Sequence, residues 1–133
     1  MNRLVARFCA GLMATALTCG AGPVASQAAA PDEAAQMHDF FGATLEIDVP
    51  NGPWSAKRYY APDHTYRETG DGGDVHGTWS VEDGKICAAQ ANAPADRPAR
   101  YCNVGLGKKL GEKWQDADPV TGNLVLFSLK AGR

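Results

Sequence analysis

The sequence predicts an all-β protein: a single small antiparallel up-and-down eight-stranded β-barrel with a short N-terminal helix and one disulfide. Three observations lead to this prediction. Fifteen glycines and eight prolines interrupt a chain of 133 residues every few positions, which favours short strands and turns over long helices. Between these interruptions apolar and polar residues alternate, as they do in strands with one buried face. Two of the four cysteines remain once an N-terminal leader is set aside.

The leader, residues 1–28, reads as a secretory signal peptide. Arg3 and Arg7 give a positive start, and no charged residue follows until Asp32. An apolar core over residues 8–17 is followed by small residues that offer cleavage sites between positions 26 and 30. This is the three-part layout of an exported precursor. We therefore expect the mature protein to be periplasmic or secreted.

A membrane anchor and a lipoprotein signal are the alternatives for this leader. The segment is rich in Ala, Gly and Thr and is broken by Pro23, which makes it a poor permanent span. Cys19 follows Ala-Leu-Thr rather than the small residues usual before a lipidated cysteine. We therefore expect cleavage, no lipid on Cys19 and no remaining membrane span.

Residues 31–133 form the predicted barrel domain. They keep 11 basic and 15 acidic residues, a formal net charge of −4. The domain therefore lacks the excess of basic residues that nucleic-acid-binding proteins carry, so we expect no nucleic-acid binding. The length suits one domain, and we expect a monomer.

Cys87 and Cys102 are the cysteines of this domain, and export predicts that they form a disulfide. The bond closes a loop of roughly fifteen residues, which is worth about 3 kcal/mol by the chain-entropy argument. A redox or metal-binding pair is the alternative. It lacks support because the sequence has no C-x-x-C motif and no histidine close to either cysteine.

A helix is predicted over residues 31–42, and strands follow it. Pro31 can start the helix, Asp32 and Glu33 suit its positive end, and Gly42 can end it. Its apolar face contains Ala34, Met37, Phe40 and Phe41. Alternation and turn residues then predict eight strands, over residues 43–49, 54–61, 65–69, 74–81, 85–90, 100–104, 114–117 and 124–130.

Turn chemistry also predicts how these strands pair. The Asp83-Gly84 dipeptide indicates a two-residue hairpin, and the preceding four-residue loop places the Tyr66 ring over Gly77 on the inner face. A shift by one residue would turn Arg67 inward and bury its charge. The expected cross-strand pairs are Glu82–Lys85, Val81–Ile86, Ser80–Cys87, Tyr66–Gly77, Cys87–Cys102 and Ala88–Tyr101.

The last predicted strand is apolar on both faces. One face is expected to line the barrel. We hypothesise that the other face receives the N-terminal helix.

Motifs for chemistry are absent from the sequence. The predicted register places His64 and His76 on opposite faces, so they cannot share a metal ion. No serine lies in a G-x-S-x-G motif, and most acidic residues fall in turns, where turn chemistry explains them. We therefore expect a non-enzymatic protein with no catalytic residue, no metal site and no cofactor.

Aromatic residues give the candidate binding site. Tyr60, Tyr66, Trp79 and Tyr101 are expected inside a barrel that is just wide enough to be filled by side chains or to hold one small ligand. Core filling is the alternative role for these rings, and the sequence leaves both open.

The segments at residues 59–65 (YYAPDHT) and 77–87 (GTWSVEDGKIC) carry a resemblance. With a Phe-Gly pair at residues 41–42, the second cysteine and a late Asp-x-x-x-Gly turn at residues 118–122, the chain resembles small exported, lipocalin-like (calycin-like) proteins of Gram-negative bacteria. The resemblance implies this fold and export, but no functional residues. His64 stands where that pattern has a turn glycine, which puts the type of that turn in doubt.

Two functions are expected from these features. The first is an exported, non-enzymatic periplasmic barrel that binds a small apolar ligand or serves as an envelope accessory. The alternative is a protein-interaction module, such as a periplasmic protease inhibitor, with an envelope protein as its partner. The alternative predicts a filled core and an ordered, exposed segment before Phe40.

Overall fold

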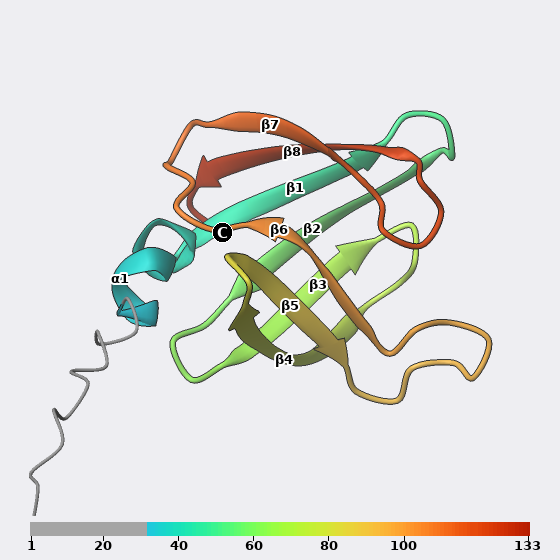
Figure 1. Cartoon of the computed structure of the whole chain (residues 1–133), viewed down its shortest axis with the longest axis horizontal. Helices are drawn as coiled ribbons and strands as arrows, with labels where there is room; N and C mark the ends of the chain where they lie inside the picture. Colours follow the sequence, from blue (N-terminus) through green and yellow to red (C-terminus); the bar gives the residue numbers. More distant parts are fainter. Residues whose placement is uncertain (1–31) are drawn as a thin grey trace, which may run out of the picture.

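The computed structural model describes residues 32–133 (Figure 1). The predicted signal peptide and the predicted helix start at Pro31 lie outside the described residues. One short α-helix, α1 (Glu33–Met37), and a 3-10 turn, η1 (His38–Phe40), precede the strands. The strands are β1 (Ala43–Val49), β2 (Trp54–Tyr60), β3 (Thr65–Gly70), β4 (Val75–Glu82), β5 (Lys85–Gln90), β6 (Arg100–Gly105), β7 (Lys113–Ala117) and β8 (Leu124–Ala131).

All eight strands belong to one antiparallel sheet in the order β6-β5-β4-β3-β2-β1-β8-β7. The sheet curls into a nearly closed barrel, with β6 and β7 as its two edges (Figure 1). A side-chain contact reaches across the gap between them, because Lys85 Nζ of β5, the strand next to β6, lies 3.7 Å from Asp116 Oδ2 of β7. The predicted fold class, including the disulfide between Cys87 and Cys102, is confirmed.

Strand bounds and register follow the sequence closely. Every strand begins and ends within one residue of its predicted bounds. The Asp83-Gly84 turn has φ values of 49° and 73°, the left-handed pair that a tight hairpin of this length needs. All the expected cross-strand pairs are present. Turn chemistry and the alternation of apolar and polar residues were therefore sufficient to predict the pairing of β3 with β4, β4 with β5 and β5 with β6.

The predicted helix over residues 31–42 was too long. Asp32 caps α1 by accepting a hydrogen bond from the Ala34 amide at 3.1 Å, and Phe41 is already extended and bridges to Tyr60. The chain leaves the helix early because the Phe40 ring packs edge-on against Tyr60, with ring centroids 5.9 Å apart. Gly42 has φ +76° and serves the turn into β1 rather than a helix end.

The hypothesis that the helix packs on the outer face of the last strand was wrong. Leu124 and Leu126 on that face stay 38% and 37% exposed. Met37 and Phe40 are instead buried in the same core cluster as the inward residues of β1. The helix therefore covers one end of the barrel, where Met37 and Phe40 remove their apolar surface from water.

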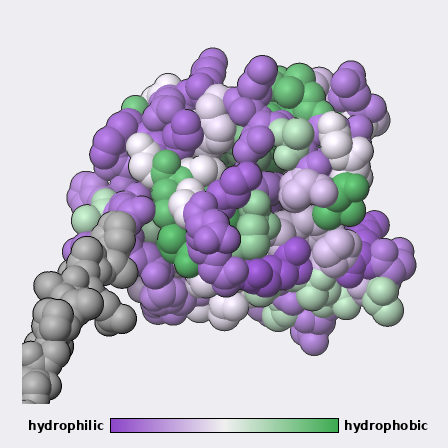
Figure 2. Space-filling view, viewed as in Figure 1, coloured by the Kyte–Doolittle hydropathy of each residue, from purple (hydrophilic) through white to green (hydrophobic). Residues whose placement is uncertain are grey.

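The surface carries few apolar residues. The face in Figure 2 is mainly hydrophilic, with apolar residues scattered in small groups. No helix within residues 32–133 is long and apolar enough to cross a membrane. The large apolar side chains that remain exposed are Leu110, Val120, Leu124 and Leu126.

Candidate functional site

The barrel has one closed end and one open end. Successive connections between strands lie alternately at the two ends. The closed end, on the left of Figure 1, contains the helix and three loops, namely residues 61–64, 83–84 and 106–112. Four loops lie at the opposite end, on the right, namely residues 50–53, 71–74, 91–99 and 118–123. This arrangement follows from the up-and-down topology, in which successive turns alternate between the two ends.

A cavity of about 360 Å³ opens between the loops of the second end. Its volume is at the lower end of the range of small-molecule sites, which is about 300–1,000 Å³. Each of the four loops at this end contributes to its rim. The apolar walls come from inward positions of the strands, namely Ile47, Val49, Trp54, Val75, Ala88, Tyr101 and Val125.

The floor of the cavity contains a buried ion pair. Arg58 on β2 lies directly opposite Glu68 on β3, and the two residues are only 7% and 8% exposed. Arg58 Nε donates to Glu68 Oε2 at 2.7 Å, and Nη2 lies 2.6 Å from the same oxygen. The guanidinium also donates from Nη1 to the Tyr60 hydroxyl at 3.3 Å and lies over the Tyr66 ring. Both charges are thus neutralised within the barrel.

The surroundings of this pair keep Arg58 charged. Burial disfavours the cation, but the electrostatic effects of Tyr60 and Glu68 and the hydrogen bonds to them outweigh it, and the pKa of Arg58 rises above its ordinary value. Burial likewise raises the pKa of Tyr60, against the opposing effect of Arg58. The floor therefore offers strong polarity without a net charge.

Asn103 shares the inward face of Tyr101 on β6, and a bulge at Asn103 brings the next residue, Val104, inward as well. Ile86 pairs with Val104, whereas Cys87 pairs with Cys102, which leaves Asn103 as the extra residue. A bulge re-aims a side chain, and here Asn103 and Val104 are both buried within the barrel. Asn103 lines the cavity and is 9% exposed. Among residues 32–133 no partner hydrogen-bonds to its Oδ1.

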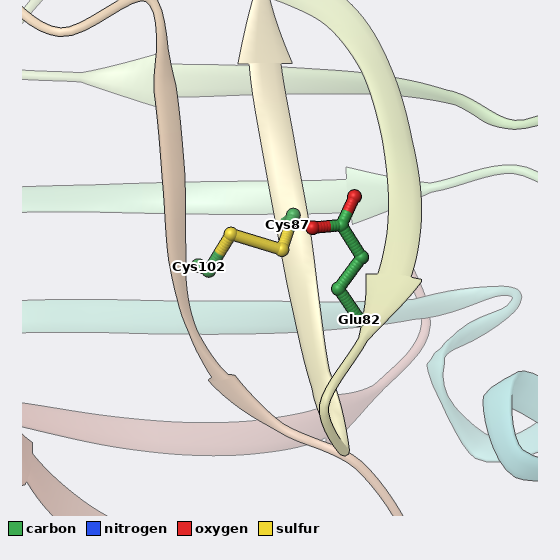
Figure 3. A group of neighbouring side chains, drawn as sticks. All are labelled: Glu82, Cys87 and Cys102. Atoms are coloured by element: carbon green, nitrogen blue, oxygen red, sulfur yellow. A yellow bond between two sulfur atoms is a disulfide. The ribbon is translucent and has the colours of Figure 1, made fainter.

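The disulfide lies beside this bulge on the outer side of the same two strands. Figure 3 shows Cys87 and Cys102 bridging β5 and β6, with the Glu82 carboxylate directed toward Cys87. These three residues form the only group within residues 32–133 with three neighbouring ligand atoms suitable for a metal. The sulfurs are bonded to each other and Glu82 pairs with Arg100. The group therefore acts as a cross-strand tie that fixes the register next to Asn103.

The structure divides the four predicted aromatic site residues into two pairs. Tyr66 and Tyr101 line the cavity. Tyr60 and Trp79 are buried in the packed half of the barrel near the helix, with ring centroids 6.3 Å apart. Trp79 Nε1 donates to the Ala61 carbonyl at 2.8 Å, so its polar group is satisfied within the core.

His64 also belongs to the closed end. Its ring stacks on Trp79 with centroids 4.3 Å apart, and its φ is +64°. The backbone at this turn therefore has the left-handed conformation that glycine favours. The stacking contact helps to offset the strain of placing a histidine there.

Sequence reasoning missed Arg58, Glu68 and Asn103. A signal for the first two was present, because Arg58 has the same strand parity as Trp54 and Tyr60, and Glu68 the same parity as Tyr66. Following that parity would have placed two opposite charges inside. Asn103 likewise has the strand parity of Tyr101, which was expected inside. Only the bulge beside it has no signal in the sequence, since one extra residue changes the register without changing the composition.

Other hollows lie outside the barrel. One, of about 580 Å³, runs over the outer faces of β2, β3 and β4 beside residues such as Tyr59, Arg67 and His76. Two further hollows lie on the outer faces of β1, β7 and β8 and of β1 to β3. They are open surface grooves between strand side chains, so the enclosed barrel cavity is the better candidate for a binding site.

Comparison with known proteins gave no match, whether with protein-family models, with curated proteins or with solved structures.

Proposed function

We propose that this protein binds a small, largely apolar molecule in the cavity of its barrel. The observation that carries the proposal is the cavity itself, which opens at one end and is closed at the other by the helix and the packed aromatic residues. Apolar walls with a few convergent polar groups are the usual composition of a small-molecule site. The protein acts by binding, without catalysis.

The size of the cavity limits the ligand. A volume of about 360 Å³ corresponds to about 12 water molecules at roughly 30 Å³ each. A compact molecule with one ring system or a short alkyl chain fits this space, whereas a long-chain lipid would protrude from the mouth. Tyr66 and Tyr101, the predicted site residues in the wall, supply the aromatic contacts.

Export is part of the same proposal. The leader at residues 1–28 and a disulfide in a small domain both suit an oxidising compartment. The resemblance to small exported lipocalin-like proteins agrees with this location. We therefore propose that the protein binds its ligand in the periplasm or after secretion.

The protein-interaction alternative predicted an ordered, exposed segment before Phe40 and a filled core. The segment before Phe40 is ordered as α1 and η1, and Asp32, Ala34, Ala35 and His38 in it are exposed, as the alternative expects. Met37 and Phe40 are buried against the barrel. The barrel also contains the cavity described above. The cavity disagrees with the filled core that the alternative expects, so ligand binding is the better-supported function.

A neutral fluorescent probe tests the proposal. We expect N-phenyl-1-naphthylamine to bind the protein with a rise in emission, because the cavity transfers it from water to apolar walls. Val75→Trp, which fills the cavity from its wall, should abolish that rise. Leu126→Trp places the same ring on the outer face of β8 and is the matched control.

Two results would refute ligand binding in the barrel. One is the absence of any probe binding to the wild-type protein when the protein is present at millimolar concentration. The other is equal binding to the Val75→Trp and wild-type proteins, which would place the probe on the outer surface.

A further inference from the structure

We infer that the ligand carries an uncharged polar head with both hydrogen-bond donors and acceptors, as in a carboxamide, and that this head binds Asn103 beside the Arg58–Glu68 pair. The inference rests on the proposed function and specifies its ligand class. It begins with the charge of the cavity. The charged residues that line it are Arg58, Glu68, Arg97 and Asp118, two of each sign.

This balance disfavours a charged ligand. An anion or a cation that entered the cavity would meet a floor whose two charges already neutralise each other at 2.6 Å. Burying a further charge at this floor is costly, because Arg58 and Glu68 are already paired with each other. At the mouth, Arg97 and Asp118 also carry opposite signs, so the rim does not attract one sign of charge over the other.

Asn103 determines which hydrogen bonds the polar head of the ligand must form. A buried amide oxygen without a hydrogen bond is a destabilising feature that folded proteins seldom keep. Here Oδ1 has no partner within the described chain, and the residue forms part of the cavity wall. Rotation about χ2, a broad torsion, lets the side chain present either its oxygen or its NH₂ group. A ligand amide or hydroxyl group can donate a hydrogen bond to the oxygen or accept one from the NH₂ group.

The position of Asn103 is fixed by the fold. It points inward at the bulge between Cys102 and Val104, and the disulfide ties β5 to β6 beside the bulge. The neighbouring polar groups of the floor, Arg58 and Glu68, are held by each other and by Tyr60. The head group therefore meets a preorganised set of donors and acceptors, which limits the entropy lost on binding.

Three probes with eight carbon atoms each test this inference: octanamide, octanoate and octylammonium. Their binding to the full mature protein is measured by displacement of N-phenyl-1-naphthylamine and by calorimetry. We expect octanamide to bind at least tenfold more tightly than either charged probe. Tightest binding of octanoate or octylammonium would overturn the inference while leaving ligand binding intact. Failure of every probe, the fluorescent one included, would instead refute the proposed function.

Asn103→Leu separates recognition from a structural role. The change removes a buried polar group that lacks a partner, so we expect an unchanged or higher melting temperature. We also expect a five- to tenfold loss of octanamide affinity and no loss for the charged probes. A fall in melting temperature together with an equal loss for every probe would make Asn103 structural and overturn the inference. Gln115→Leu, at an exposed position of β7, is the matched control and should leave all affinities unchanged.

Discussion

Arg58 directs two nitrogens of its guanidinium at a single oxygen of Glu68 inside the barrel, and the two residues face each other across β2 and β3. Arg58→Met should leave the Glu68 carboxylate buried without its counter-charge and destabilise the protein by about 3 kcal/mol. Arg58→Met/Glu68→Leu removes both charges and should recover most of that loss. Urea unfolding of the single and double variants measures the coupling.

An exposed pair provides the control for this cycle. Lys130 and Glu46 form an ion pair on the outer face of β8 and β1, where water screens the charges. Lys130→Met should therefore lower the free energy of unfolding by less than about 1 kcal/mol. An Arg58→Met variant no less stable than Lys130→Met would show that the cavity hydrates the Glu68 carboxylate fully.

Gly77 is required by the close approach of the strands around it. A Cβ atom at this position would lie 1.9 Å from the Ala89 carbonyl oxygen and 2.9 Å from Tyr66 Cε1. Gly77→Ala should therefore destabilise the protein by about 3 kcal/mol, the upper part of the range for overpacking. Thermal unfolding measures the loss. Gly105→Ala in β6, whose Cβ would meet only Lys108 Cε at 3.6 Å, should be nearly neutral; an equal loss in both variants would contradict the steric explanation.

Buried tyrosines predict a loss of stability at alkaline pH. Burial raises the pKa of Tyr60 above that of an unfolded tyrosine, which is about 10. The folded state then holds the proton more tightly than the unfolded state. The resulting stability is complete below about pH 10 and is lost as the pH rises above it. Denaturant unfolding between neutral pH and pH 11, followed with the ultraviolet absorbance of phenolate, measures this dependence.

Tyr60→Phe should flatten that alkaline loss, although Tyr66, whose pKa burial also raises, should keep part of it. Tyr59→Phe changes a ring on the opposite face of the same strand and is the control. If the Tyr60→Phe protein lost stability above pH 10 as steeply as the wild type, Tyr60 would not be the group that resists ionisation.

The strands were predictable because each one carries its own local signals. The Asp83-Gly84 hairpin fixed the pairing of Val81 with Ile86, and the inward Tyr66 ring over Gly77 fixed the preceding pair. In both cases a shift by one residue would have exposed an apolar face or buried a charge. Local turn chemistry and burial agreed, so the register had one consistent solution.

The cavity could not be predicted in the same way, because it depends on how side chains from distant strands share one interior. Sequence reasoning placed Tyr66 and Tyr101 inside but could not distinguish the open half of the barrel from the half that the helix and Trp79 fill. The helix was assigned to the outer face of the last strand for the same reason. Its burial at the closed end depends on the aromatic cluster with Tyr60, which no single segment encodes.

The disulfide links the stability of the fold to the binding site, and its removal should affect both. Cys87 and Cys102 are separated by 15 residues, so Cys87→Ala/Cys102→Ala should lower the free energy of unfolding by about 3 kcal/mol. Because the bond adjoins the bulge at Asn103, octanamide affinity should fall as well. Thermal unfolding and probe displacement on the same samples measure the two effects. Stability lost with octanamide affinity intact would show that the β5–β6 ladder holds the bulge unaided, and the disulfide would then stabilise the fold without positioning Asn103.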